Sequence, residues 1–267
     1  MTRYETHLEG TACWADILTS DPARTVAFYG EVFGWTADEP SEEFGGYRNF
    51  RRDGEWVAGC MQRQEGMPAD CWSVYLSTPD IDATLRRAVE AGGAIAMPAQ
   101  PVGDLGSFGA VADPKGVWTM VWQPGTHRGF TTVGEPNAPG WFDLTTGDME
   151  ASLEFGRKVF GWTPHMVFDN PEMRYAVNQR GEEMDFGVMQ AQGALPGGNP
   201  GAWYLHLAVA DVDRTIADIE RLGGTVVEPA TDTPFGRLAV TRDATGAVLK
   251  LVGPNEAMPM TGAPGTE

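Results

Sequence analysis

The sequence has few residues of the kinds that build disulfides, metal sites or nucleic-acid interfaces. Its three cysteines, Cys13, Cys60 and Cys71, are odd in number and confined to the first half of the 267 residues. This pattern argues against a disulfide framework and a cysteine-rich zinc site. Only 19 lysines and arginines oppose 37 aspartates and glutamates, giving a formal net charge of −18. Because nucleic acids and anionic membranes attract basic surfaces, we expect neither as a partner.

Long apolar segments are missing as well. No run approaches the length of a membrane span, and the first ten residues lack the apolar stretch of a secretory signal. Hydrophobic residues make up 42% and charged residues 21%, which is ordinary for a globular protein. We therefore expect a cytoplasmic protein whose acidic surface is solvated.

The chain contains an internal repeat. Residues 14–35 and 141–162 are identical at nine of 22 aligned positions, including a tryptophan at each end. The turn sequence Asp113-Pro-Lys-Gly116 recurs as Asp243-Ala-Thr-Gly246. A duplication of this kind indicates two copies of one structural unit. We predict two modules, a linker and a flexible tail, at residues 10–124, 140–253, 125–139 and 254–267, respectively.

Each copy carries local signals for a mixed α and β structure. An apolar strand at 14–19 is followed by Asp21, a favourable helix N-cap, and by Pro22, which suits the first helical position. Gly34 ends this helix, and Asp53-Gly54 predicts the turn of a hairpin. A further strand, a second helix and two last strands follow.

This pattern resembles the vicinal oxygen chelate superfamily, which includes glyoxalase I, extradiol dioxygenases and the fosfomycin- and bleomycin-resistance proteins. The resemblance is carried by the strand ending at Asp21, the segment 27–35, the strand into Asp80-Ile-Asp82, the pair Gly92-Gly93 and the turn 113–116. It implies an α+β fold of two tandem modules. Each module is then a pair of βαβββ units that form a curved mixed sheet around a cavity. The scaffold hosts many chemistries, so the resemblance predicts fold more sharply than function.

Metal-using members of this superfamily place His, Gln or Glu donors at three structural positions. The matching positions hold Trp14, Ser73 and Met120 in the first copy, and Trp141, Tyr204 and Lys250 in the second. None of these side chains is a competent ligand for a divalent ion, and Lys250 adds a positive charge. We therefore expect no metal ligands and no cofactor.

Strand alternation predicts which side chains share the inner face of each sheet. On the inner face we place seven ligand-binding candidates: Trp14, Asp16, Tyr75, Trp118, Trp122, Trp141 and Tyr204. Aromatic rings with a few polar groups suit a flat organic ligand. The alternative is that the indoles fill the concavity as core.

Polar residues on the same face are candidates for acid–base chemistry. Asp16 and Asp143 occupy equivalent positions, and their repetition favours a structural role, such as bonding a neighbouring indole N–H, over a catalytic one. His206 and Lys250 occur only in the second copy, which makes that copy the better candidate for a specific site. Asp143, His206 and Lys250 are the candidate catalytic residues. The alternatives are a Lys250–aspartate ion pair and a hydrogen-bonded core histidine.

The leading hypothesis is metal-independent binding of a small, planar aromatic molecule, in the manner of a sequestering or resistance protein. The acidic balance favours a cationic compound. The alternative is a metal-free lyase, isomerase or cyclase that uses Asp143, His206 and Lys250 as acid–base groups. A third interpretation is an interaction protein with a vestigial pocket. A monomer or weak dimer is expected, because two fused modules can supply the pairing that single modules achieve by dimerising.

Overall fold

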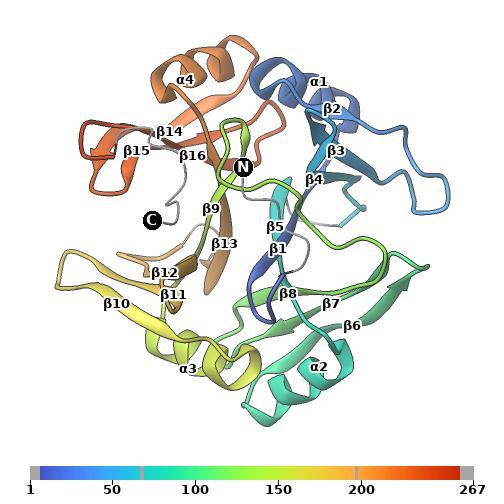
Figure 1. Ribbon diagram of the computed structural model, residues 1–267, viewed down its shortest axis with the longest axis vertical. Helices are drawn as coiled ribbons and strands as arrows, with labels where there is room; N and C mark the ends of the chain where they lie inside the picture. Colours follow the sequence, from blue (N-terminus) through green and yellow to red (C-terminus); the bar gives the residue numbers. More distant parts are fainter. Residues whose placement is uncertain (1–6, 67–68, 196–197, 259–267) are drawn as a thin grey trace.

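The computed structural model describes residues 7–66, 69–195 and 198–258, and it contains two eight-stranded mixed sheets (Figure 1). The first module comprises β1 (Ala12–Thr19), α1 (Pro22–Phe33), β2 (Thr36–Ala37), β3 (Arg48–Arg52), β4 (Glu55–Gln62), β5 (Cys71–Ser77), α2 (Ile81–Glu90), β6 (Ala94–Val102), β7 (Gly106–Ala112) and β8 (Trp118–Pro124). The second comprises β9 (Ala138–Thr146), α3 (Met149–Phe160), β10 (Pro164–Asp169), β11 (Arg174–Arg180), β12 (Glu183–Gln190), β13 (Gly201–Ala208), α4 (Val212–Arg221), β14 (Thr225–Thr233), β15 (Gly236–Arg242) and β16 (Val248–Gly253). The tail predicted from residue 254 lies outside the described residues from 259 onward.

The two sheets have the same topology. Their strand orders are β2-β3-β4-β1-β5-β8-β7-β6 and β10-β11-β12-β9-β13-β16-β15-β14. In each sheet two βαβββ units meet at the antiparallel central pair, β1 with β5 and β9 with β13. The predicted α+β fold of two tandem modules is therefore confirmed. No helix among the described residues is long and apolar enough to cross a membrane.

Edge strands are the part of the fold that the sequence signals do not reveal. The structure has three strands after the second helix of each module, as a βαβββ unit requires, whereas the local signals had predicted two; the additional strands are β6 and β14. β6 contains Pro98 and Pro101, and β14 contains Pro229. Proline lacks the N–H that an interior strand needs, but these strands lie at a sheet edge, where one side is free of pairing.

The helix boundaries follow the predicted caps. The Asp21 carboxylate accepts the Arg24 backbone N–H at 3.0 Å, and Asp148 accepts the Ala151 N–H at 3.1 Å. Gly34, with φ of 71°, and Gly161, with φ of 67°, end the two helices in the left-handed conformation that glycine adopts without strain. The duplicated Asp and Gly residues therefore fix where α1 and α3 begin and end.

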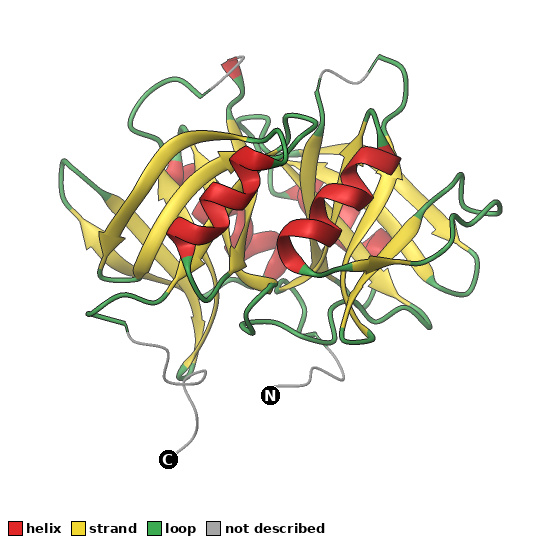
Figure 2. Ribbon diagram, turned by 90° about the horizontal axis from the view of Figure 1, so that it is seen from above, coloured by secondary structure: helices red, strands yellow, loops and turns green. Residues whose placement is uncertain are grey.

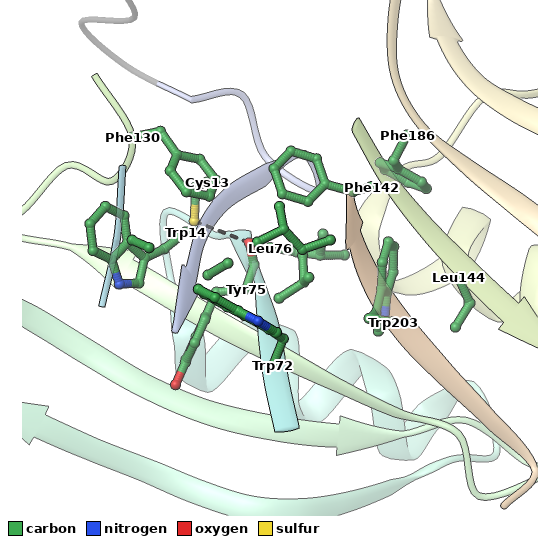
Figure 3. Close-up of a cluster of buried hydrophobic side chains, with 14 of the residues drawn as sticks. Cys13, Trp14, Trp72, Tyr75, Leu76, Phe130, Phe142, Leu144, Phe186 and Trp203 are labelled. Atoms are coloured by element: carbon green, nitrogen blue, oxygen red, sulfur yellow. Dashed lines mark hydrogen bonds between the residues drawn. The ribbon is translucent and has the colours of Figure 1, made fainter. Parts of the chain in front are cut away.

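The hydrophobic core continues across the boundary between the two modules. Leu76 of β5 and Leu205 and Leu207 of β13 are fully buried, and β5 packs against β13. Figure 3 shows Leu76 and Phe142 side by side between these strands. The apolar side chains of the central strands β5 and β13 thus face the other sheet. The helices also pair across the boundary, α1 with α4 and α2 with α3, as the labels of Figure 1 and the turned view of Figure 2 show.

The duplicated Asp-x-x-Gly turns also join the modules. Asp113 Oδ1 accepts the backbone N–H groups of Lys115 and Val117, while its Oδ2 accepts the Ser152 hydroxyl at 2.7 Å. Asp243 bonds its own turn in the same way, and its Oδ2 accepts the Tyr29 hydroxyl at 3.1 Å. Each aspartate therefore shapes a turn in one module and anchors a helix of the other.

The modules differ where α3 packs against Trp162, the tryptophan that follows this helix, and this difference yields a prediction about stability. A Cβ on Gly156 would overlap the indole ring of Trp162. We expect Gly156→Ala to lower the free energy of unfolding by about 1–3 kcal/mol through overpacking, despite the better helix propensity of alanine. The measurement is urea unfolding followed by circular dichroism.

Gly30→Ala in α1 is the matched control, because its Cβ would approach only the Trp35 carbonyl oxygen, at 3.2 Å. It should stay within about 1 kcal/mol of wild type. Equal losses in the two variants would contradict the assigned packing of Trp162.

Candidate functional site

The concave face of each sheet carries the side chains that alternation placed there, and strand register makes the two faces comparable. Tyr75 pairs with Met120 across β5 and β8, and His206 pairs with Lys250 across β13 and β16. The modules therefore have equivalent positions that hold different chemistry. The equivalent pairs are Trp14 and Trp141, Asp16 and Asp143, Ser73 and Tyr204, Tyr75 and His206, and Met120 and Lys250.

In the first module, Asp16 lies in a buried network of aromatic side chains. The Tyr75 hydroxyl donates to Asp16 Oδ2 at 2.9 Å, and the Trp14 indole N–H donates to the Tyr47 hydroxyl at 2.8 Å. Burial raises the pKa of Asp16 to about 7, and the tyrosine hydrogen bonds offset only part of this shift. Near neutral pH this carboxyl is therefore only partly ionised.

The linker closes the first concave face. His127, from the segment between β8 and β9, is buried among three tryptophans: it stacks on Trp56 with ring centroids 4.6 Å apart and meets Trp14 and Trp122 edge-on. The Trp122 indole N–H donates to the His127 carbonyl at 2.9 Å. Burial lowers the pKa of His127 to about 4, so the ring is neutral at pH 7. The expected aromatic residues Trp14 and Trp122 thus pack around a histidine of the same chain.

Trp118 does not share this enclosure. Its side chain lies at the start of β8 and is 54% exposed, whereas Trp14 is 4% exposed. The sequence placed both on the inner face as ligand-binding residues. Strand alternation predicts a face, but it carries no information on how far along the strand the sheet remains covered. The exposed position separates Trp118 from the other aromatic candidates of its module.

In the second module, Asp143 is the centre of a denser polar cluster. Its Oδ1 accepts the Tyr175 hydroxyl at 2.8 Å and the Trp141 indole N–H at 3.1 Å. Its Oδ2 lies 2.6 Å from His206 Nε2 and 3.8 Å from Lys250 Nζ. The structure therefore brings together the three residues that the sequence proposed as acid–base groups. Tyr175, on β11, was not among the sequence candidates.

The charges of this cluster follow from burial and pairing. Burial would raise the pKa of Asp143, but the hydrogen bonds from His206 and Tyr175 and the positive charge of Lys250 outweigh it and hold this pKa well below its usual range. Burial lowers the pKa of His206 and outweighs the Asp143 carboxylate beside it. Burial also lowers the pKa of Lys250, while Asp143 and Glu228 oppose that shift. At neutral pH we therefore assign an ionised Asp143 that accepts a hydrogen bond from neutral His206.

Lys250 and Tyr204 form the part of the cluster nearest to solvent. The Lys250 ammonium lies 4.5 Å from the centre of the Tyr204 ring, a cation–π distance. Trp141 and Tyr204 are half-buried, in contrast to their fully buried neighbours Asp143 and His206. A ligand on this face would therefore meet two aromatic rings and the ammonium first.

A pocket of about 420 Å³ opens beside this cluster. Thr145, two residues along β9 from Asp143, contributes to its wall, and so do Met173 and Met189. Glu228 also lines it, and the charge of Glu228 acts on Lys250. The pocket and the polar cluster therefore lie on one continuous face of the second sheet.

The donor set of this face does not fit a divalent metal. The three positions at which metal-using relatives carry donors hold an indole, a phenol and an ammonium group, and the ammonium would repel a dication. The Asp143 oxygens are already engaged by four neighbouring groups. Within the described residues, no group of three or more His, Cys, Asp and Glu side chains could hold a metal ion.

The sequence matches the model of the Glyoxalase/Bleomycin resistance protein/Dioxygenase superfamily over residues 11–121 and 138–251. "Putative glyoxylase CFP32" of Mycobacterium tuberculosis is 32% identical over 260 residues, which cover 95% of this chain and 98% of the relative. "Anthracycline biosynthesis protein DnrV" of Streptomyces peucetius is 32% identical, with coverage of 97% and 98%.

Solved structures with the same fold include a metal-bound glyoxalase and a dioxygenase. The Mn(II)-bound glyoxalase from Novosphingobium aromaticivorans superposes with a TM-score of 0.63 at 13% identity, covering 94% of this chain and 83% of that one. The 2,3-dioxygenase LapB from a Pseudomonas species gives 0.65 at 12% identity, with coverage of 98% and 97%. At these identities the likeness concerns the fold alone.

The different surroundings of the two equivalent aspartates predict opposite mutational effects. Asp143→Asn should lower the free energy of unfolding at pH 7 by about 3–5 kcal/mol, because the buried Lys250 loses its counter-charge. Asp16→Asn should leave the stability unchanged or raise it, because Asp16 has no such cation to balance and its ionisation is disfavoured by burial. Urea unfolding of the three proteins measures both effects.

The raised pKa of Asp16 fixes the direction in which the stability of the protein changes with pH. The pKa of Asp16 is about 7 in the folded chain against an ordinary value of 3.8, so the folded state binds the proton more tightly than the unfolded state. Wild type should therefore lose stability relative to Asp16→Asn as the pH rises from about 4 to about 7. A difference that stays constant over this range would contradict the raised pKa.

Proposed function

The chain belongs to the Glyoxalase/Bleomycin resistance protein/Dioxygenase superfamily, and from this premise we propose that its second module binds a small, planar aromatic organic molecule without a metal ion. The proposed site is the concave face around Lys250 and Tyr204, together with the adjoining pocket. In this proposal the module holds the compound rather than converting it, as a sequestering or resistance protein does.

The position of Lys250 carries the proposal. Its ammonium replaces a metal donor of the superfamily, 3.8 Å from Asp143 Oδ2 and 4.5 Å from the Tyr204 ring centre. A buried ammonium supplies a positive charge and hydrogen-bond donors to a ligand oxygen. A carbonyl or phenolic oxygen that would otherwise coordinate a metal can therefore be held by the chain itself.

The shape of the ligand is inferred from the surrounding rings. Trp141 and Tyr204 are half-buried on the concave face. Phe235, from the turn between β14 and β15, approaches Tyr175 with ring centroids 5.7 Å apart, which brings the two ends of the curved sheet together. Flat aromatic molecules gain about 0.5–1.5 kcal/mol per ring contact beyond area burial. A planar ligand is therefore favoured over an aliphatic one.

The names of two relatives agree with this inference. DnrV and "Anthracycline biosynthesis protein DauV", from a Streptomyces species, are named for anthracycline biosynthesis, and the latter is 33% identical over 97% of this chain. Anthracyclines are built on fused planar rings. We take a fused-ring compound with carbonyl or phenolic oxygens as the ligand class.

The first module is proposed to have no ligand of its own. His127 occupies the centre of its aromatic face, and the position equivalent to Lys250 holds Met120. The matching segment after β16 contacts the rim instead: Asn255 donates to the Thr233 carbonyl at 2.9 Å. One ligand per chain is therefore expected.

One observation favours a second candidate function, a metal-free lyase, isomerase or cyclase. The 2.6 Å contact between His206 Nε2 and Asp143 Oδ2 orients a neutral imidazole in the way that acid–base enzymes do. In that case His206 would transfer a proton, and Asp143 would fix its tautomer and stabilise the imidazolium. Lys250 would then stabilise the developing negative charge on the substrate oxygen.

Calorimetric titration with 1,8-dihydroxyanthraquinone in the presence of a metal chelator tests the binding function. Wild type should bind one molecule per chain. Lys250→Met, which installs the residue found at the equivalent position of the first module, should weaken binding at least about ten-fold through loss of a charged hydrogen bond. Met120→Leu is the control and should bind as wild type does. Two equal sites per chain, or full affinity in Lys250→Met, would refute the proposal.

Mass analysis of the same compound after prolonged incubation separates binding from turnover. The leading proposal predicts the compound unchanged. Conversion that is abolished in His206→Gln, with the dissociation constant retained, would establish the enzyme alternative. The His206→Gln variant must keep the unfolding profile of wild type for this comparison to count.

A further inference from the structure

The pocket beside the polar cluster has features that define its ligand more narrowly. It lies where β9 and β12 end, and its lining comes from these strands, from the turn before β11, from the segment after β12 and from β14. Its apolar wall is formed by Met173, Met189 and Leu195. The selectivity inferred for this pocket rests on the function proposed for the second module and specifies which planar compounds that module binds.

One residue of the pocket wall has a buried polar atom without a partner. Thr145 is 5% exposed, and its Oγ1 is buried and makes no hydrogen bond within the part of the chain that the structure describes. A buried hydroxyl without a partner costs about 1–3 kcal/mol, so such groups are normally satisfied. Thr145 also lines the pocket, so a ligand bound there would be the source of the missing hydrogen bond.

The rim of the pocket is acidic. Glu172, in the turn before β11, and Glu228, on β14, are exposed carboxylates that line it from separate elements. Among the described residues that line the pocket there is no lysine, arginine or histidine. Arg174, the nearest arginine in sequence to Glu172, is held by Asp169 and Glu150 at 2.7 Å each. The rim therefore presents negative charge to a ligand.

The duplicated module shows that this polarity is particular to the second half. By strand register, Thr145 corresponds to Leu18 and Glu228 corresponds to Met97. The first module thus has apolar side chains at both positions, on the same scaffold and at the same end of its sheet. A requirement of the fold would act on both copies, so the polar pair belongs to the second site rather than to folding.

We propose that this pocket selects planar compounds that carry a protonated amine, with the Thr145 hydroxyl bonding a polar atom of the ring system and the carboxylates of Glu172 and Glu228 pairing with the amine. Lys250 excludes the amine from the inner end of the site, because like charges repel. The ligand is therefore oriented, with its oxygen-bearing ring toward Lys250 and its amine toward the rim.

Two probes with the same ring test this proposal by calorimetry: 1,8-dihydroxyanthraquinone, and the same anthraquinone carrying a 2-aminoethyl side chain. Wild type should bind the amine probe about ten-fold more tightly, and this preference should shrink as salt is raised. The double variant Glu172→Gln/Glu228→Gln should bind both probes equally. Thr145→Val should weaken both probes by a similar factor.

Glu182→Gln is the matched control, because it removes a carboxylate that is exposed in the same module but does not line the pocket. It should keep the full preference for the amine. If wild type binds both probes equally, or if Glu182→Gln loses as much preference as the rim variants, the amine selectivity is refuted while ring binding stands. If neither probe binds, the proposed function and this inference are both overturned.

Discussion

The carboxylate of Asp143, buried at the centre of the second sheet, sets the chemistry of everything around it. A buried charge must be paired or hydrogen-bonded, and this one is satisfied by an indole, a phenol, an imidazole and an ammonium group at once. Lys250 lies beside that aspartate as its counter-charge. His206 is held in a fixed orientation by the same carboxylate. The end of the cluster nearest to solvent is the largely buried Lys250 ammonium over the half-buried Tyr204 ring.

The first module shows what the same scaffold does without that cation. Asp16 occupies the position equivalent to Asp143. Tyr75 and Met120 stand where the second module has His206 and Lys250, so no neighbouring cation offsets the burial that disfavours ionisation of Asp16. The concave face is then completed by His127 and three tryptophans and behaves as core. The duplication thus provides one packed half and one polar half, and the core between β5 and β13 joins them into one body. The proposal of a single ligand site per chain rests on this division.

The sequence predicted those parts that depend on local signals or on repetition. The caps at Asp21 and Asp148, the tandem modules and the convergence of Asp143, His206 and Lys250 all follow from short-range patterns and strand parity. Strand alternation predicts the face on which a side chain lies but not how deeply that side chain is buried, and Trp118 therefore could not be distinguished from Trp14. His127 lies in a segment without periodicity, so nothing in its neighbourhood indicated that it packs into the first concavity. Tyr175 and Glu228 reach the site from outer strands whose register only the structure supplies.

The metal content of the purified protein is the most direct test of the central claim, because a lysine ammonium is proposed to stand in place of a bound dication. Protein purified without chelators should contain manganese, nickel, zinc and iron far below one ion per chain, and adding or removing these ions should not change the affinity for a planar ligand. Stoichiometric metal that is lost together with ligand affinity on chelation, and regained with it, would contradict the role assigned to Lys250.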